Sequence, residues 1–203
     1  MLRTPPRTNG TRDQIIAAAE RVFTRHGIEK ASVTDIVREA RVGRATFYKS
    51  FANKEAVFAE VFEREVREMV VDVRAAVAGA GDTRARLRTA LLTNMALIRE
   101  HVNVYRVTLE SLHEMMPLCL READLRHMSE EFVALYADIL ERGVKEKEIE
   151  VADVRKTAWV LLLLLKGLFL GSATGDVGDD RESVVDGVVN MVMDGLRPRE
   201  VQG

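Results

Sequence analysis

The sequence predicts an all-α protein with a small N-terminal headpiece of three helices and a larger C-terminal helical body, about nine helices in all. Two observations lead to this prediction. Apolar residues recur along most of the chain at the spacing of one helix face. The chain has only 4 prolines and 5% aromatic residues, and it contains long stretches of Ala, Leu, Val, Arg and Glu, a composition typical of helical proteins. A chain of 203 residues that is 47% hydrophobic can bury a sizeable core.

The first predicted helix follows a short basic arm, residues 2–10, which has little to pack. It begins at Thr11, and Gln14 stands at the spacing of a capping box. Gly27, directly after His26, is the expected end of the helix, because glycine adopts the left-handed conformation of a helix C-terminus. The apolar stripe consists of Ile15, Ala18, Ala19, Val22 and Phe23. This helix is therefore expected to support the two that follow it.

Residues 32–51 predict two short helices joined by a tight corner, which is a helix-turn-helix. Ser32 is a natural N-cap of the first helix, and Asp35 occupies the partner position of a capping box. The apolar face of that helix consists of Val33, Ile36, Val37 and Ala40. In the second helix Phe47 and Phe51 lie one turn apart and are expected to face the core.

The opposite face of the second helix carries candidate DNA-binding residues. Ala45 and Lys49 point nearly opposite to the phenylalanines at the angular spacing of a helix. This face offers a small side chain, a hydroxyl, a phenol and two cations, which can contact base edges and phosphates in a major groove. The candidates on this helix and at its start are Gly43, Arg44, Ala45, Thr46, Tyr48 and Lys49.

The charge is distributed unevenly along the chain. Its net charge of −2 alone would argue against a nucleic-acid partner. Residues 1–54, however, carry 11 Lys/Arg and 5 Asp/Glu, a net of +6, whereas residues 55–203 carry 19 and 27, a net of −8. This asymmetry is typical of a basic DNA-binding domain, residues 1–54, attached to an acidic body, residues 55–203.

Three groups of residues resemble the tetracycline-repressor (TetR) family of bacterial regulators. They are Gly27 with Ser32-Val33, then Ala40-Arg41-Val42, and then the string TFYKSFANKE, Thr46 to Glu55. The resemblance implies a homodimeric, ligand-responsive repressor that binds a pseudo-palindromic operator on double-stranded DNA. The sequence departs from the family pattern at Arg41, where Gly is usual, and at Gly43, where a Ser usually caps the recognition helix and touches a phosphate.

The resemblance also implies roles for individual residues. Thr46, Lys49 and Arg44 would face bases, and Tyr48, Lys54, Ser32 and Thr34 would hold phosphates. The positive end of a helix that begins at Lys54 would support its phosphate contact. Arg41 can offset the phosphate contact that Gly43 lacks.

Six further helices are expected in the body, the first of them capped by Asn53. They cover residues 54–78, 83–100, 105–115, 117–147, 154–171 and 183–196. The helix of residues 54–78 is expected to be the one rigid link between headpiece and body, so any signal between the two must use it. The last two helices are apolar over more than one face, which predicts contact with a second copy of the chain. The resemblance implies a four-helix dimer interface made by residues 153–171 and 183–196.

The resemblance further implies that the body binds a small-molecule effector, expected to be apolar or amphipathic. Aromatic and methionine side chains suit such a cavity, although each could equally belong to an ordinary core. Lys166 lies in an apolar run and either extends its ammonium to solvent or faces an acidic ligand. The candidates are Met95, Tyr105, Leu109, Met116, Phe132, Tyr136, Trp159, Lys166 and Phe169.

An enzyme is not expected, because the sequence has no phosphate loop, nucleophile elbow or HExxH motif, and no cofactor is predicted. Two alternatives remain open. One is an architectural DNA-binding protein without an effector. The other is a helical di-metal enzyme, since Glu110 with His113 and Asp124 with His127 have the spacing of di-iron ligands, which iron content would test. Surface ion pairing explains the same spacing.

The chain is expected to be cytoplasmic. Its single cysteine, Cys119, forms no internal disulfide, and its start lacks the apolar segment of a secretory signal. The longest apolar run, residues 158–165, is too short for a membrane span.

Overall fold

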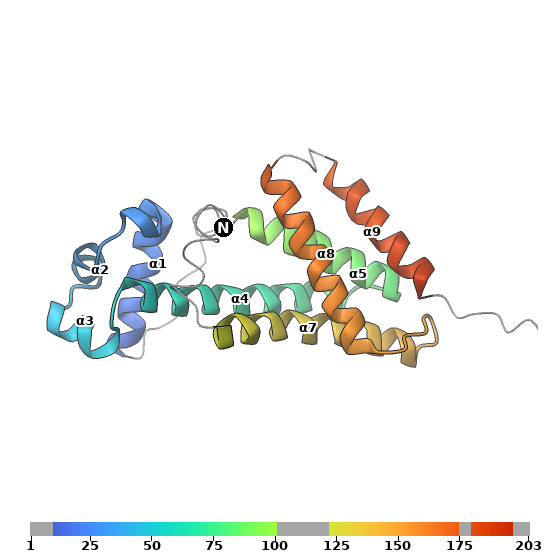
Figure 1. Cartoon of the computed structure of the whole chain (residues 1–203), viewed down its shortest axis with the longest axis horizontal. Coiled ribbons are helices and arrows are strands. Elements are labelled where there is room, and N and C mark those ends of the chain that lie inside the picture. The colour runs from blue at the N-terminus through green and yellow to red at the C-terminus, as the bar shows by residue number, and fades with distance from the viewer. Residues whose placement is uncertain (1–9, 101–121, 175–179, 197–203) are drawn as a thin grey trace, which may run out of the picture. The chain divides into compact units, whose positions relative to one another are not determined.

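The computed structural model describes residues 10–100, 122–174 and 180–196, and Figure 1 shows the helices that they form. These residues form eight helices and no strand, which confirms the all-α prediction. The helices are α1 (Thr11–Lys30), α2 (Val33–Ala40), α3 (Arg44–Ser50), α4 (Lys54–Ala78), α5 (Thr83–Glu100), α7 (Glu122–Lys145), α8 (Val154–Thr174) and α9 (Arg181–Gly195). The helix predicted over residues 105–115 lies outside the described residues.

The chain divides into two compact units. Unit 1 comprises Met1–Val66 and Glu100–Arg126, and unit 2 comprises Arg67–Arg99 and His127–Gly203. The long helix α4 contributes its first turns to unit 1 and its remainder to unit 2. No helix in the described part of the chain is long and apolar enough to cross a membrane.

The core of unit 1 joins α1, α2, α3 and the start of α4. The predicted stripe of α1 is buried throughout, and Phe23 packs edge-on against Phe58 of α4 with ring centroids 5.6 Å apart. Arg12 closes the other side of this core, because its guanidinium lies 4.3 Å from the centre of the Phe51 ring and donates to the Ser50 carbonyl. The cation stacked on the ring and the hydrogen bond hold the end of α3 against α1.

The predicted capping box of α1 is wrong. Gly10 is the N-cap and makes no side-chain cap hydrogen bond. Gln14 instead donates from Nε2 to the Ala40 carbonyl, 2.8 Å away at the end of α2. A helix C-terminus has carbonyl groups without partners in its own helix, and the Ala40 carbonyl is one that the Gln14 amide can reach.

The predicted end of α1 at Gly27 is also only partly correct. Gly27 has φ 72° and ψ 160°, a conformation that suits glycine alone, so the helix is interrupted there as expected. The chain then resumes a helical path as far as Lys30, because Ile28 and Ala31 are buried in the headpiece core. The kink turns these two side chains inward.

The core of unit 2 joins the second part of α4 with α5, α7, α8 and α9. Asn53 caps α4 as predicted, since its Oδ1 accepts the Ala56 N–H at 2.8 Å. The predicted bounds of α4 are confirmed, while α8 extends to Thr174, beyond the predicted end. Buried residues of α5 recur along one stripe that includes Leu87, Leu91 and Met95, as the apolar spacing predicted.

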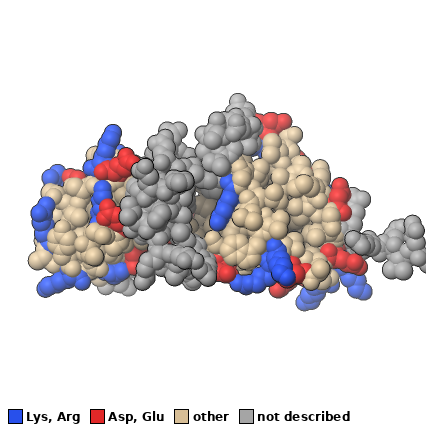
Figure 2. Space-filling view, in the orientation of Figure 1, with Lys and Arg blue, Asp and Glu red and all other residues tan. Residues whose placement is uncertain are grey.

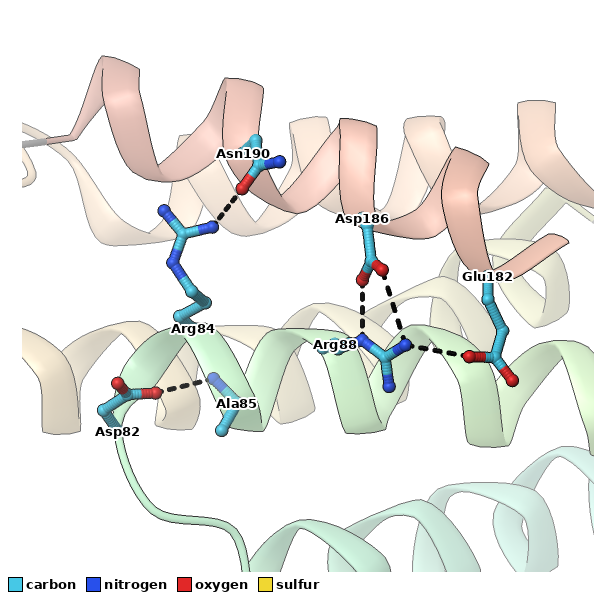
Figure 3. A network of polar contacts seen from close by, with 7 residues as sticks. All are labelled: Asp82, Arg84, Ala85, Arg88, Glu182, Asp186 and Asn190. Atoms are coloured by element: carbon cyan, nitrogen blue, oxygen red, sulfur yellow. Dashed lines mark hydrogen bonds and ion pairs between the residues drawn. The ribbon is translucent and has the colours of Figure 1, made fainter. Parts of the chain in front are cut away.

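A polar network joins α5 to α9 along one edge of unit 2 (Figure 3). Arg88 donates from Nε to Asp186 at 2.6 Å and from Nη2 to Glu182 at 3.0 Å. One turn earlier, Arg84 hydrogen-bonds to Asn190. The hydrogen bonds that Arg88 donates to Asp186 and then to Glu182 raise its pKa, so the guanidinium stays charged. This network orients α9 relative to α5, while Val185 and Val189 bury its inner face.

Candidate nucleic-acid interface

The first helix of the helix-turn-helix begins at a complete capping box, as predicted. Ser32 Oγ accepts the Asp35 N–H at 3.2 Å, and the Asp35 carboxylate accepts the Ser32 N–H at 3.1 Å. The Ser32 hydroxyl also donates to Asp35 Oδ2 at 2.6 Å, and this bond is the main reason that the pKa of Asp35 is lowered. The hydroxyl predicted to hold a phosphate is therefore already engaged in shaping the helix start.

The corner between α2 and α3 keeps a regular geometry despite its unusual residue. Arg41 adopts the left-handed conformation, with φ 54° and ψ 40°. Its N–H reaches the Arg38 carbonyl and the Val42 N–H reaches the Val37 carbonyl at 3.1 Å, the two hydrogen bonds of a Schellman motif. A non-glycine residue in this region costs about 1–2 kcal/mol. Arg41 thus carries local strain but does not refold the turn.

The faces of α3 lie as the helical spacing predicted. Phe47 is fully buried and Phe51 is nearly so, whereas Ala45, Tyr48 and Lys49 are exposed. Thr46 is partly buried at the edge of the outer face. Basic side chains are visible on the surface of unit 1 that α2 and α3 form (Figure 2). The exposed face of α3 is thus free to approach DNA.

Arg44 and Thr34 are linked to each other across the corner. Arg44 Nη2 donates to Thr34 Oγ1 at 2.6 Å, so a residue of α2 positions a guanidinium of α3. Both residues are exposed. The guanidinium has further N–H groups available for a base or phosphate while this hydrogen bond remains. No pattern in the sequence predicted this pairing, because it joins two helices through side chains alone.

Lys54 occupies a place that the sequence did not predict. Its ammonium donates to the carbonyls of Ile28, Glu29 and Ala31 at 2.8, 3.3 and 3.1 Å. A lysine has three N–H donors, and all three are directed at the end of α1. A phosphate contact by Lys54 stays a prediction, but it would require this lysine to give up hydrogen bonds that hold the headpiece together.

We expect Gly43→Ser to stabilise the protein by roughly a few tenths of a kcal/mol, and by about 1 kcal/mol relative to Gly43→Ala, and to strengthen DNA binding. Gly43 is the N-cap of α3 with φ −76° and ψ 152°, and it makes no side-chain cap hydrogen bond. A Cβ there would meet only Thr46 Oγ1 at 3.9 Å, so a serine fits. Chemical denaturation checks the stability, and Gly43→Ala is the control that adds a Cβ without a hydroxyl. Equal stability of the two variants would contradict the capping explanation.

The predicted effector-binding residues differ in their burial, and some of them lie outside the described residues. Met95 and Tyr136 are buried in the core of unit 2, and Phe132 and Trp159 pack against that core while partly buried. Lys166 is an exposed residue whose Nζ approaches Ser129 Oγ at 3.4 Å, and burial of part of its side chain lowers its pKa. Tyr105, Leu109 and Met116 lie outside the described residues, and so does the side chain of Phe169. The sequence did not single out Asn94, which is fully buried beside Tyr136.

The metal alternative finds no support in the described part of the chain. No group of three or more His, Cys, Asp or Glu residues that could hold a metal ion occurs there. The side chains of Glu110, His113, Asp124 and His127, on which that alternative depends, lie outside it.

Comparison with known proteins adds an independent line of support. Residues 15–61, which span most of α1, the corner and the start of α4, match the family of bacterial regulatory proteins named tetR. This part of the chain belongs to the TetR family. Its sequence is 26% identical over 185 residues to the transcriptional activator FasR of Mycolicibacterium smegmatis, covering 91% of this chain and 82% of FasR. This TetR-family protein is therefore a DNA-binding transcriptional regulator and not an enzyme.

Solved structures extend the likeness over both units. The fatty acid degradation regulator FadR of Bacillus halodurans is 25% identical, with a TM-score of 0.70 over 95% of this chain and 100% of that one. FadR of Bacillus subtilis, solved in complex with stearoyl-CoA, shares the fold with a TM-score of 0.68 at 19% identity, over 91% of this chain and 98% of that one. The TetR-family fold thus includes the helical body as well as the headpiece.

Proposed function

We propose that this TetR-family regulator is a ligand-responsive repressor that binds a pseudo-palindromic operator as a homodimer. The observation that carries the DNA-binding part is the exposed outer face of α3 beside a rigid corner. Arg44, Thr46 and Lys49 contact base edges, and Tyr48 and Thr34 hold phosphates. Ser32 and Lys54 act mainly by shaping the headpiece, because their donors are already engaged. A regulator that acts on bacterial DNA works in the cytoplasm.

The homodimer is proposed from the outer faces of α8 and α9. Val160 and Leu163 of α8 are 53% and 60% exposed, and Met191 of α9 is 59% exposed, which is costly for large apolar side chains in water. Val185 and Val189 bury the opposite face of α9 against the core of unit 2. The surface over α8 shows few charged residues (Figure 2). A second copy of the chain would cover this apolar face, as the sequence pattern predicted.

The proposed effector is an amphipathic molecule with a long apolar part, of which a long-chain acyl-CoA is the first candidate. The body of this chain supplies buried aromatic and methionine side chains, including Met95 and Tyr136. FadR of Bacillus subtilis, which shares the fold, was solved with stearoyl-CoA. Binding changes operator affinity only if the effector prefers one arrangement of the two headpieces. Helix α4, which contributes to both units, is the element that would carry the change.

The test is binding of the purified protein to the DNA upstream of its own gene at several salt concentrations, with a scrambled duplex as control. We expect the protein to prefer the upstream duplex and its affinity to fall steeply with salt. We also expect palmitoyl-CoA, but not CoA alone, to release the protein from this duplex. Equal and weak binding to both duplexes would contradict an operator at that position. Operator binding that no acyl-CoA changes would contradict the proposed effector class alone.

Thr46→Ala is expected to relax base preference while leaving binding to the scrambled duplex nearly unchanged. Thr46 lies at the edge of the exposed α3 face, where one hydrogen bond from its hydroxyl to a base edge contributes about 0.5–1.5 kcal/mol. Competition between operator variants measures the preference. An equal loss of affinity for operator and scrambled DNA would show that Thr46 does not read bases.

Leu163→Glu is expected to convert the dimer to a monomer. A carboxylate placed in the centre of the proposed interface would be buried without a partner, which costs several kcal/mol. Sedimentation velocity measures the oligomeric state, and Val71→Glu is a matched control, since Val71 is a similarly exposed apolar residue on α4. A Leu163→Glu protein that remains dimeric would place the interface elsewhere.

A further inference from the structure

The buried stripe of α5 contains an amide that is only half satisfied. Asn94 is fully buried, and its Nδ2 donates both hydrogens, one to the Ala90 carbonyl at 3.0 Å and one to the Tyr136 hydroxyl at 3.2 Å. Its Oδ1 accepts no hydrogen bond from the residues that the structure describes. A buried acceptor left without a partner costs about 1–3 kcal/mol.

The opposite orientation of the amide does not remove this deficit. Exchanging the oxygen and nitrogen of Asn94 would place the oxygen 3.0 Å from the Ala90 carbonyl oxygen, so two acceptors would face each other. The amino group would then take the place where the oxygen now finds no partner. The hydrogen bonds therefore determine the orientation, and the unpaired atom is an acceptor.

Tyr136 supplies the complementary group. Its side chain is fully buried in α7, and its hydroxyl oxygen accepts the hydrogen from Asn94. In the hydrogen bonds found among the described residues, the Tyr136 hydroxyl takes part only as an acceptor, and its hydrogen is donated to none of them. Burial raises the pKa of Tyr136 well above its usual value, against the weaker opposing effect of the Asn94 hydrogen bond, so the phenol stays neutral. Among the described residues, the pair thus offers an acceptor without a donor and a hydroxyl hydrogen without an acceptor, from adjacent side chains.

The surroundings of this pair are apolar. Leu91 and Met95 flank Asn94 on α5, and Val133 and Leu140 lie one turn to either side of Tyr136 on α7, all within the core of unit 2. A charged group brought here would lose its hydration without gaining an ionic partner. Its burial would cost far more free energy than burial of a neutral polar group. A neutral group that both donates and accepts a hydrogen bond would satisfy both free positions.

We propose that Asn94 and Tyr136 form the hydrogen-bonding site for an uncharged polar group, a hydroxyl or an amide, of an otherwise apolar effector. This inference rests on the proposed effector-binding function and adds to it a chemical preference. The Asn94 Oδ1 accepts the hydrogen of the ligand's hydroxyl or amide, and the Tyr136 hydroxyl donates to its oxygen. Selectivity arises because a ligand without that group leaves both protein groups unpaired.

The test compares 1-decanol with decanoate at pH 8, using Tyr136→Phe, Asn94→Leu and the double variant. Titration of each ligand into each protein gives dissociation constants, and a palmitoyl-CoA operator-release assay runs in parallel. The wild-type protein is expected to bind decanol at least tenfold more tightly than decanoate, and each variant to weaken decanol binding about tenfold. The double variant is expected to fold with a melting temperature at or above that of the wild type, because it replaces a polar pair that is only partly hydrogen-bonded with apolar groups of similar shape.

Two outcomes would overturn the inference. Decanol affinity that is unchanged in all three variants would show that the pair holds an ordered water only. Failure of the wild type to bind decanol, while palmitoyl-CoA still releases the operator, would contradict the hydroxyl site and leave the effector class standing. If palmitoyl-CoA also has no effect on operator binding, the proposed effector class itself is wrong.

Discussion

Lys54→Met is expected to lower the free energy of unfolding of the headpiece by about 2 kcal/mol, because a hydrogen bond to a charged group contributes about 1.5–3 kcal/mol. The ammonium donates to three carbonyls at the end of α1, where Gly27 has interrupted the helix. Methionine keeps the length of the side chain and removes every donor. Hydrogen exchange of α1 to α3 detects the loss, since those amides report the local stability of unit 1.

The same variant separates the two roles that Lys54 can have on DNA. A lysine that contacts a phosphate contributes about one unit to the slope of log affinity against log salt. We expect Lys54→Met to weaken operator binding with little change in that slope, because its effect comes through the shape of the headpiece. A slope reduced by about one unit, with unchanged stability, would instead establish the phosphate contact.

Lys49→Met is the matched control for this experiment. Lys49 carries the same charge on the exposed face of α3. Its replacement is expected to reduce the salt slope by about one unit and to leave the stability within about 0.5 kcal/mol of the wild type. Identical behaviour of the two variants would show that the hydrogen bonds of the Lys54 ammonium to the end of α1 have no separate consequence.

Gly143→Ala is expected to destabilise unit 2 by about 1–3 kcal/mol, the usual cost of overpacking. A Cβ on Gly143 of α7 would overlap with Thr83 Oγ1 and would lie 3.1 Å from Ile149 Cδ1. Thr83 is fully buried at the start of α5, and its backbone N–H donates to Glu148 at 2.6 Å, so the segment cannot simply move away. Urea denaturation measures the loss.

Two companion variants isolate the cause. Gly79→Ala is the control, because a Cβ there meets nothing within 4 Å. This variant is expected to be as stable as the wild type or more stable by up to about 1 kcal/mol. Thr83→Ala combined with Gly143→Ala removes the overlapping hydroxyl and is expected to recover most of the loss. A double variant as unstable as Gly143→Ala alone would assign the strain to Ile149 instead.

The headpiece was predictable from the sequence because its signals are local. The apolar spacing predicted which faces of α2 and α3 are buried, and Ser32 with Asp35 predicted the start of α2. The same spacing placed Phe47 inside and Lys49 outside. Each of these features depends on residues within two helical turns of one another, where sequence distance and spatial distance agree.

The sequence-based prediction was wrong or incomplete where a side chain hydrogen-bonds to a residue far away along the chain. Gln14 donates to Ala40 instead of capping its own helix, and Lys54 turns back to the end of α1. Arg44 pairs with Thr34 across the corner. None of these contacts leaves a periodic signal, because each depends on how two helices meet.

The sequence by itself determined the helical class, the approximate positions of the described helices, the basic headpiece and the buried face of each short helix, since local geometry and burial of apolar side chains decide these. Only the tertiary structure decided which polar groups are engaged and which remain free. It placed Lys54 on carbonyl oxygens and left Asn94 half satisfied beside Tyr136. The physical reason is that a polar side chain takes the best partner within its reach in space, and packing between helices decides what lies within that reach.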